Sequence, residues 1–255
     1  MLGIVTISGP AFATASLRLL PELAEHRTAE VAAAAEVFVR SLRADGVIQA
    51  FGTGHSQAAA LEVAGRAGGL IPTNRIGLSD LVLFGGADPA VLADPLLERR
   101  PDTAARLYEL AAPHPTDAFV IASNSGVNGA IVEMARLVKS RGHELVAITS
   151  LAHTWQVPAT HESGLRLADL ADVVLDNGAP YGDSLLELPG GGKACAVSSM
   201  TSALLVQLVV AETIRRLLDA GEEPPVYISA NVPGGYERNL VLEQRYAGRI
   251  RRIAQ

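Results

Sequence analysis

The chain has 255 residues, 49% of them hydrophobic, so it is long enough to bury a large core. Its formal net charge of −6 argues against nucleic acid or an anionic membrane as a partner, and its one cysteine, Cys195, excludes an intrachain disulfide and a zinc ribbon. No apolar run reaches the roughly 20 residues of a membrane span, and the first residues lack a signal-peptide pattern, which predicts a cytoplasmic protein.

The chain begins with a helical pattern and then alternates between short strands and helices. Apolar residues recur at helical spacing over residues 11–43, where Pro21 is expected to break or kink the helix. Apolar runs predict strands over residues 47–51, 119–122, 145–149 and 172–176. The main helices are expected over residues 57–66, 197–218 and 236–252. Because the strands lack polar alternation, the pattern predicts a parallel sheet covered on both faces.

Arg249, Arg251 and Arg252 form a small basic cluster close to the C-terminus. We interpret it as the solvated end of the last helix rather than as a binding patch, since the chain as a whole is acidic.

Two of the strand-to-helix loops are rich in small polar residues. Residues 52–56 read Gly-Thr-Gly-His-Ser, and residues 123–128 read Ser-Asn-Ser-Gly-Val-Asn. In a parallel sheet both loops lie at the carboxyl ends of the strands, and free N–H groups at helix starts favour an anion there. The predicted phosphate-binding residues are Gly54, Ser56, Ser123, Asn124, Ser125, Asn128, Ser198 and Ser199. The alternative is that these serines only cap helices.

A dinucleotide site is disfavoured by the first of these loops. Gly52 and Gly54 begin a GxG pattern, but Gln57 occupies the place of the third glycine, and no GxxxxGK[ST] phosphate loop is present.

The two loops and the strand end Ala147-Ile148-Thr149 resemble the SIS (sugar isomerase) domain over roughly residues 30–220. That family includes phosphosugar isomerases and N-acetylmuramic acid 6-phosphate etherases. The resemblance implies a three-layer αβα sandwich with a parallel, flavodoxin-like sheet, a phosphorylated sugar as ligand, no cofactor and a homodimer. The helices at 11–43 and 236–252 would flank this core in a single domain spanning residues 1–255. The family's serine loop often reads Ser-x-Ser-Gly-x-Thr/Ser, and Asn128 replaces its final hydroxyl residue.

Glu62 is the preferred candidate for a catalytic base. It follows His55 by seven residues, two helical turns, so both are expected on one side of a helix, and its neighbours are mostly alanine. His55 and His153 are predicted to assist, with Asp183 in reserve. The alternatives are a solvated helix glutamate and a loop-capping histidine. The histidines lack the spacing of an HExxH site, so we expect no catalytic metal.

Three functions fit these residues. The first is a lyase that removes the C2 proton of an amino-sugar 6-phosphate, such as N-acetylglucosamine 6-phosphate, and expels the C3 substituent. The second is an aldose–ketose isomerase, which shares that proton abstraction. The third is a phosphosugar sensor without activity, which the absence of a helix-turn-helix pattern makes less favoured.

Overall fold

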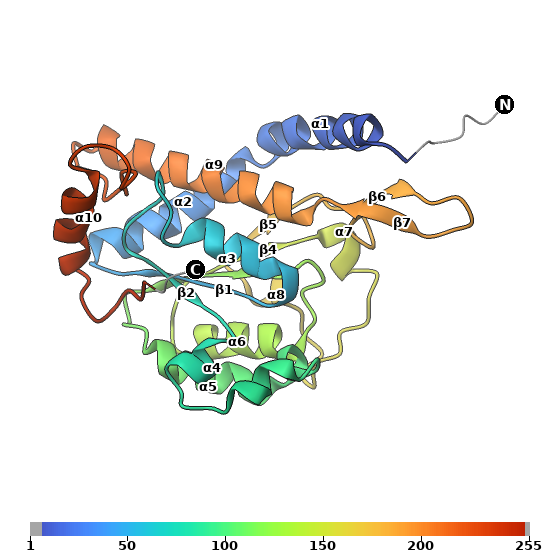
Figure 1. The fold of residues 1–255 in the computed structure, drawn as a ribbon, viewed down its shortest axis with the longest axis horizontal. Helices are drawn as coiled ribbons and strands as arrows, with labels where there is room; N and C mark the ends of the chain where they lie inside the picture. Colours follow the sequence, from blue (N-terminus) through green and yellow to red (C-terminus); the bar gives the residue numbers. More distant parts are fainter. Residues whose placement is uncertain (1–6, 253–255) are drawn as a thin grey trace.

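The computed structural model describes residues 7–252 and contains a five-stranded parallel sheet (Figure 1). The strands stand in the order β2-β1-β3-β4-β5, and Ile48 of β1 pairs with both Thr73 and Ala118 at the amino end of the sheet. Their bounds are β1 Ile48–Gly52, β2 Thr73–Ile76, β3 Ala118–Ala122, β4 Leu145–Thr149 and β5 Val173–Asp176. The four predicted strands are confirmed with small shifts at their ends, and β2 is an additional edge strand.

Helices cover both faces of this sheet, which confirms the predicted three-layer αβα sandwich (Figure 1). One face carries α2 Thr28–Arg43, α3 Gln57–Val63 and α9 Ser198–Asp219. The other carries α4 Asp80–Leu83, α5 Pro101–Ala111, α6 Gly129–Ser140 and α8 Leu167–Leu170. Alternate residues of β3 point to opposite layers: Val120 packs with the first set of helices and Phe119 with the second. Short elements complete the core: α7 Leu151–Thr154 and the 3₁₀ turns Gly54–Ser56, Pro89–Ala93 and Leu97–Arg99.

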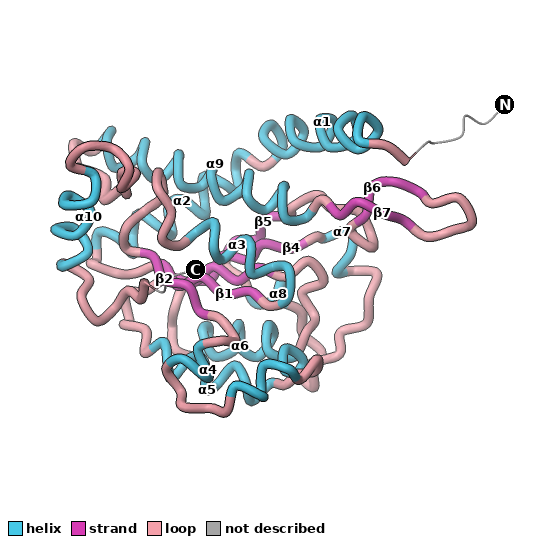
Figure 2. The backbone as a smooth tube through the Cα atoms, in the orientation of Figure 1, coloured by secondary structure: helices cyan, strands magenta, loops and turns pink. Residues whose placement is uncertain are grey.

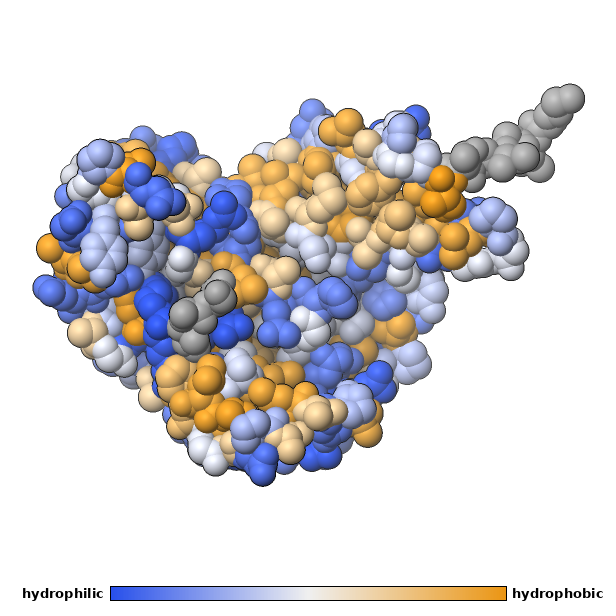
Figure 3. Space-filling view, viewed as in Figure 1, coloured by the Kyte–Doolittle hydropathy of each residue, from blue (hydrophilic) through white to orange (hydrophobic). Residues whose placement is uncertain are grey.

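Helix α1, Gly9–His26, and a two-stranded hairpin lie outside the sandwich at one end of the molecule (Figure 2). The hairpin consists of β6 Ser184–Glu187 and β7 Lys193–Ala196, paired antiparallel. Apolar side chains gather on the surface over α1, the start of α9 and the hairpin (Figure 3). Exposed hydrophobic residues of these segments include Leu17, Leu188 and Met200.

Three predicted helix bounds are wrong. Pro21 lies inside α1, and the break falls instead at Arg27, whose guanidinium pairs with Asp176 at 2.7 Å and holds the chain where it turns. The helix expected over residues 57–66 ends at Val63, since Gly65 adopts a φ of +78° that a continuing helix does not allow. The helix expected over residues 236–252 is α10, Gly235–Gln244, which is followed by turns.

The last described residues are not a solvated helix end. They run along the edge strand β2 and the amino ends of its neighbours, where their guanidinium groups are partly buried. Arg249 donates to Asp117 Oδ1 at 2.6 Å, and Arg252 donates to the carbonyl oxygens of Ile71 and Thr73 at 2.8 and 2.9 Å. The arginine cluster therefore fastens the C-terminal segment to the sheet. Among residues 7–252, no helix combines the length and apolar character needed to cross a membrane.

Candidate functional site

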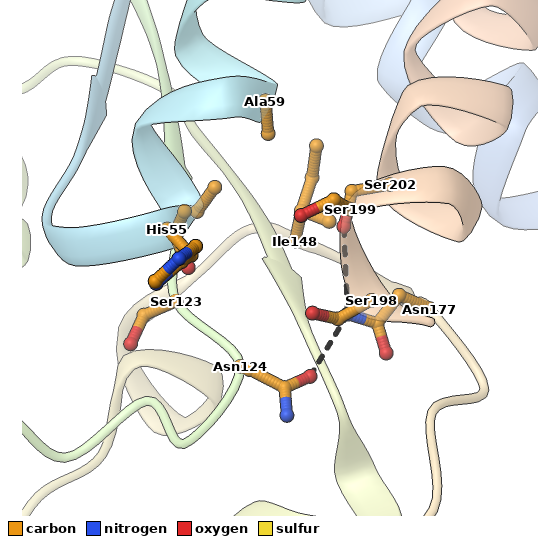
Figure 4. A pocket seen from close by; sticks show the side chains of 11 residues that line it. His55, Ala59, Ser123, Asn124, Ile148, Asn177, Ser198, Ser199 and Ser202 are labelled. Atoms are coloured by element: carbon orange, nitrogen blue, oxygen red, sulfur yellow. Dashed lines mark hydrogen bonds between the residues drawn. The ribbon is translucent and has the colours of Figure 1, made fainter. Parts of the chain in front are cut away.

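A small hollow lined by hydroxyl and amide groups, here called the polar pocket, opens at the carboxyl ends of the strands (Figure 4). In this strand order the chain leaves β1 and β3 toward opposite faces, which creates the crevice where ligands of such sheets bind. The polar pocket occupies that crevice. Its lining residues are His55, Ser56, Ala59, Ala122, Ser123, Asn124, Ile148, Asn177, Ser198, Ser199 and Ser202.

The loop after β1 turns tightly because two glycines permit it. A Cβ on Gly52 would lie 2.5 Å from the carbonyl oxygen of Ser56, and Gly54 has a φ of +53°. The chain then makes a 3₁₀ turn over Gly54–Ser56 before α3 begins. This turn brings His55, which is exposed, and Ser56 to the polar pocket, as predicted for Ser56. Gly54 shapes the loop and has no side chain to offer a ligand.

The loop after β3 brings in Ser123 and Asn124 but not the other predicted residues. Ser123 Oγ accepts a hydrogen bond from the Gly126 amide at 3.1 Å, and Asn124 Oδ1 accepts one from Asn177 Nδ2 at 3.1 Å. Ser125 is not among the residues that line the polar pocket. Asn128 starts α6 and donates through Nδ2 to Glu98 at 3.3 Å, beside a separate hollow of about 510 Å³.

The start of α9 supplies Ser198, Ser199 and Ser202. Asp183 caps this helix: its carboxylate accepts the amide of Ser198 at 2.8 Å, the amide of Val197 at 3.2 Å and the hydroxyl of Ser198 at 2.6 Å. A carboxylate so occupied stabilises the helix N-terminus. Asp183 therefore caps α9 and lies outside the lining of the polar pocket, and its reserve catalytic role stays a prediction.

Glu62 also lies outside the polar pocket. Its carboxylate pairs with Arg66 one turn later and accepts a hydrogen bond from Gln207 of α9 at 2.6 Å. The seven-residue spacing from His55 fails to bring the two side chains together because His55 is in the 3₁₀ turn, which has a tighter repeat than the α-helix that begins at Gln57. The side chain is 17% exposed, so it is neither a fully solvated residue nor a group facing this hollow.

His153 lies on the far side of β4, beside the loop that leads to the hairpin. Its Nδ1 accepts a hydrogen bond from the Gly182 amide at 3.1 Å, and its ring centroid lies 5.1 Å from that of Tyr181. It does not line the polar pocket. Of the four predicted catalytic residues, His55 is therefore the one that the fold brings to this hollow.

Three polar residues near the site were missed by the sequence analysis. Asn177 directly follows the predicted strand 172–176, and Ser202 lies one helical turn after Ser198, so strand-end position and helical spacing would have found both. Glu98 carries no such signal. Its carboxylate reaches the β1 loop from the turn Leu97–Arg99, and its Oε2 lies 3.2 Å from the position of a Cβ on Gly54.

The polar pocket is small and carries no Lys or Arg in its lining. Its volume of about 10 Å³ accommodates roughly one water molecule, so a phosphate group requires side chains to move. Hydroxyl and amide groups can donate hydrogen bonds to an anion without a formal positive charge. Within the part of the chain that the structure describes, no three His, Cys, Asp or Glu side chains are grouped as a metal site would need.

Comparison with known proteins identifies the family. The model of the SIS domain matches residues 11–150. A UPF0309 protein of Listeria monocytogenes is 40% identical over 243 residues, which is 95% of this chain and 98% of the relative. A UPF0309 protein of Brucella canis is 36% identical over 231 residues, 90% of this chain and 92% of the relative.

Solved structures share the fold at lower identity. A phosphoheptose isomerase from Francisella tularensis superposes with a TM-score of 0.55 at 16% identity, over 81% of this chain and 96% of that one. A phosphoheptose isomerase from Neisseria gonorrhoeae gives a TM-score of 0.53 at 20% identity, over 79% and 94% of the two chains. Fold, crevice and sequence relatives agree, and the chain belongs to the SIS domain family.

Proposed function

We propose that the chain binds a phosphorylated sugar in the polar pocket and removes a proton beside the sugar's carbonyl group. The observation that carries the proposal is the convergence of three separate segments on one crevice: the loop after β1, the loop after β3 and the start of α9. Membership of the SIS family supports a phosphosugar ligand. The solved neighbours with the same fold are named as phosphoheptose isomerases, which supports an enzyme.

The phosphate end of the sugar would be bound by neutral donors. Ser56, Ser199 and Asn124 line the polar pocket, and within residues 7–252 neither serine hydroxyl nor Asn124 Nδ2 donates a hydrogen bond. Hydrogen bonds from such groups to a charged phosphate are stronger than those between neutral partners. The His55 side chain is exposed, and its movement would enlarge the hollow.

Two carboxylates are candidates for the base. Glu62 was expected from the sequence and would have to leave Arg66 and Gln207 before it could accept a substrate proton. Glu98 also lies outside the lining of the polar pocket, but its carboxylate approaches the β1 loop at Gly54 and accepts a hydrogen bond from Asn128, so it could face a sugar above Gly54. We propose Glu98 beside Glu62 for this role, with His55 placed to donate to a sugar oxygen.

The proton abstraction can lead to two reactions. In an open-chain sugar, the C1 aldehyde acidifies the C2 hydrogen, and the base takes that proton as an enolate forms. In isomerisation, the proton of the C2 hydroxyl passes to O1, the base returns a proton to C1, and a ketose results. In elimination from an amino-sugar 6-phosphate, a C2=C3 double bond forms, the C3–O bond breaks, and a 3-hydroxyl leaves as water after it takes up a proton. The resemblance to the etherases favours elimination, whereas the names of the two solved neighbours favour isomerisation.

The test is incubation with hexose, heptose and N-acetylhexosamine 6-phosphates in D₂O, followed by mass and proton NMR measurement. Loss of water supports elimination, and a ketose of otherwise unchanged composition supports isomerisation. Binding of a sugar phosphate without any product, seen as thermal stabilisation, would replace the enzyme by a sensor. Absence of both binding and turnover across the panel would overturn the proposal.

We also propose that the chain forms a homodimer. The exposed apolar side chains over α1, α9 and the hairpin support a contact with a second copy, since large exposed apolar patches mark interaction surfaces (Figure 3). Light scattering should give twice the mass of the chain. A Leu17→Glu, Met200→Glu double variant should shift the mass to that of the single chain, and a monomeric unmodified protein would refute this assembly.

A further inference from the structure

Four arginine side chains surround a second hollow, at the edge of the sheet, here called the basic hollow. It has a volume of about 170 Å³ and shares no lining residue with the polar pocket. Arg66 follows α3, Arg75 lies on β2, and Arg251 and Arg252 belong to the C-terminal segment. Three distant parts of an acidic chain therefore bring four cationic groups to one place.

Two of the four arginines are fixed by contacts that leave the hollow open. Arg252 donates to Tyr227 Oη at 2.7 Å and to the backbone carbonyl groups of Ile71 and Thr73, just before and at the start of β2. Arg251 donates to the carbonyl oxygen of Leu110, and its guanidinium lies 4.4 Å from the ring centroid of Phe84. Guanidinium groups held in this way lose little side-chain entropy when an anion binds.

The other two arginines differ in their partners. Arg66 pairs with Glu62. Arg75 makes no ion pair and no side-chain hydrogen bond within residues 7–252, although it is only partly exposed. Gly77 leaves room for it: a Cβ there would lie 3.3 Å from Arg75 Cζ. The guanidinium of Arg75 thus keeps its donors available at the edge of the basic hollow.

The carboxylates nearby do not balance these charges. Glu62 pairs with Arg66, and Glu243 lies 3.4 Å from Arg252 Nε, but neither Arg75 nor Arg251 has a carboxylate partner within the described range. A further acid is Asp80, which is buried and makes no ion pair with these arginines among residues 7–252. Burial raises the pKa of Asp80, whereas the hydrogen bond from the Gly77 amide and the attraction of Arg75 and Arg251 lower it. Four guanidinium groups with only two paired carboxylates repel one another, and a bound anion would relieve this repulsion.

We propose that the basic hollow is a second anion site, which takes the phosphate group of a small metabolite. Guanidinium forks match the oxygens of a phosphate group, and a phosphate dianion matches the two arginines without carboxylate partners. The volume fits a phosphate monoester or diphosphate rather than a whole nucleotide. The site is distinct from the proposed substrate site, because helix α3 lies between the two hollows and contributes to both linings.

The experiment measures binding of inorganic phosphate by calorimetry to a chain without a C-terminal tag, since the basic hollow lies beside the C-terminal segment. A background with Ser56→Ala and Ser199→Ala weakens the polar pocket. In this background Arg75→Gln should weaken phosphate binding at least tenfold, whereas Arg106→Gln, an equal charge loss on the exposed face of α5, should leave it unchanged.

Equal affinities in Arg75→Gln and Arg106→Gln, or absence of phosphate binding in the background, would overturn the second site. Melting temperatures of the variants show whether each is folded. Failure of the proposed function is seen separately, because sugar-phosphate binding and turnover are measured in the Arg75→Gln chain with its polar pocket intact. That variant should retain both.

Discussion

The two ends of the parallel sheet use buried polar residues in opposite ways. At the amino end, Asp117 accepts hydrogen bonds from the Val47 amide at 2.8 Å, Gln49 Nε2 at 2.9 Å, the His114 amide at 3.0 Å and Arg249 at 2.6 Å. Gln49 in turn accepts from Asn74, whose Oδ1 accepts the amide of Arg251. This network is saturated, and it ties the C-terminal segment to the sheet.

At the carboxyl end, the polar groups are only partly engaged. Asn177 links Asn124 to Ser202, with donor–acceptor distances of 3.1 and 3.5 Å, while the hydroxyl groups of Ser56 and Ser199 face the polar pocket. A saturated network stabilises the fold, and an unsaturated one keeps donors for a ligand. The difference predicts that substitutions at the amino end mainly change stability and those at the carboxyl end mainly change binding.

The largest effect on stability is expected for Asp117→Ala. It leaves the partly buried Arg249 without its carboxylate, and the buried Val47 amide and Gln49 Nε2 and the partly buried His114 amide without an acceptor, so the free energy of unfolding should fall by about 3–5 kcal/mol. Urea denaturation measures it. Glu223→Ala is the control, because Glu223 also pairs with an arginine but is 82% exposed, and its loss should cost below about 1 kcal/mol. Similar losses in both variants would contradict the saturated network.

The largest effect on turnover is expected when the catalytic base is replaced. Glutamine keeps the shape of glutamate and removes its basicity, so Glu98→Gln should lower turnover by roughly 100-fold or more with little change in substrate binding. Glu62→Gln is the matched variant. If Glu62 is the base, Glu62→Gln shows the loss of turnover and the turnover of Glu98→Gln stays near normal. Near-normal turnover in both would exclude a carboxylate base at either position.

The strands were predictable from the sequence because buried parallel strands are continuous apolar runs. Strand β2 was not, because Thr73, Asn74 and Arg75 are polar and its pairing with β1 depends on a partner distant in the chain. The polar pocket was partly predictable, since strand-end loops meet at one edge of the sheet. Asn177 follows the same rule, Ser202 lies one helical turn after Ser198, and both were overlooked.

The placement of the carboxylates could not be predicted. A seven-residue spacing describes an unbroken α-helix, but His55 lies in a 3₁₀ turn before α3, so the spacing does not fix its direction relative to Glu62. Glu98 reaches Gly54 through a contact across more than forty residues of chain, which no local pattern encodes. The role of Arg249 was misread for a similar reason, since its partner Asp117 is 132 residues away.

A smaller effect separates two serines of the polar pocket. Ser199→Ala should weaken sugar-phosphate binding by about 1–2 kcal/mol and leave the free energy of unfolding unchanged, because its hydroxyl has no partner among the described residues. Ser123→Ala should lower both, since Ser123 Oγ also accepts the Gly126 amide. Calorimetry measures sugar-phosphate binding by the two variants, and urea denaturation measures their free energies of unfolding. Loss of stability in Ser199→Ala would show that the carboxyl end is as engaged as the amino end.

The smallest effect is expected for Tyr227→Phe, on the amino side of the comparison. Tyr227 packs with Val47 and Ile71, and its hydroxyl donates to Glu243 and accepts from Arg252 at 2.7 Å. Loss of these bonds should cost about 1 kcal/mol at neutral pH, without any change in sugar-phosphate binding.

The pH dependence of the stability lost in Tyr227→Phe tests whether the loss comes from the hydroxyl proton. Burial, and then the hydrogen bond to Glu243, raise the pKa of Tyr227 to about 12, above the value of about 10 for an unfolded tyrosine. The folded chain therefore holds this proton more tightly, so the stabilisation is complete below about pH 10 and is lost as the pH rises toward 12. Phenylalanine has no such proton. The difference in the free energy of unfolding between the unmodified chain and Tyr227→Phe, measured by urea denaturation, should therefore be smaller at about pH 11 than at about pH 8. If this difference did not change with pH, the hydroxyl of Tyr227 would stabilise the C-terminal segment by packing alone. The amino end of the sheet would then depend less on its hydrogen bonds than the saturated network implies.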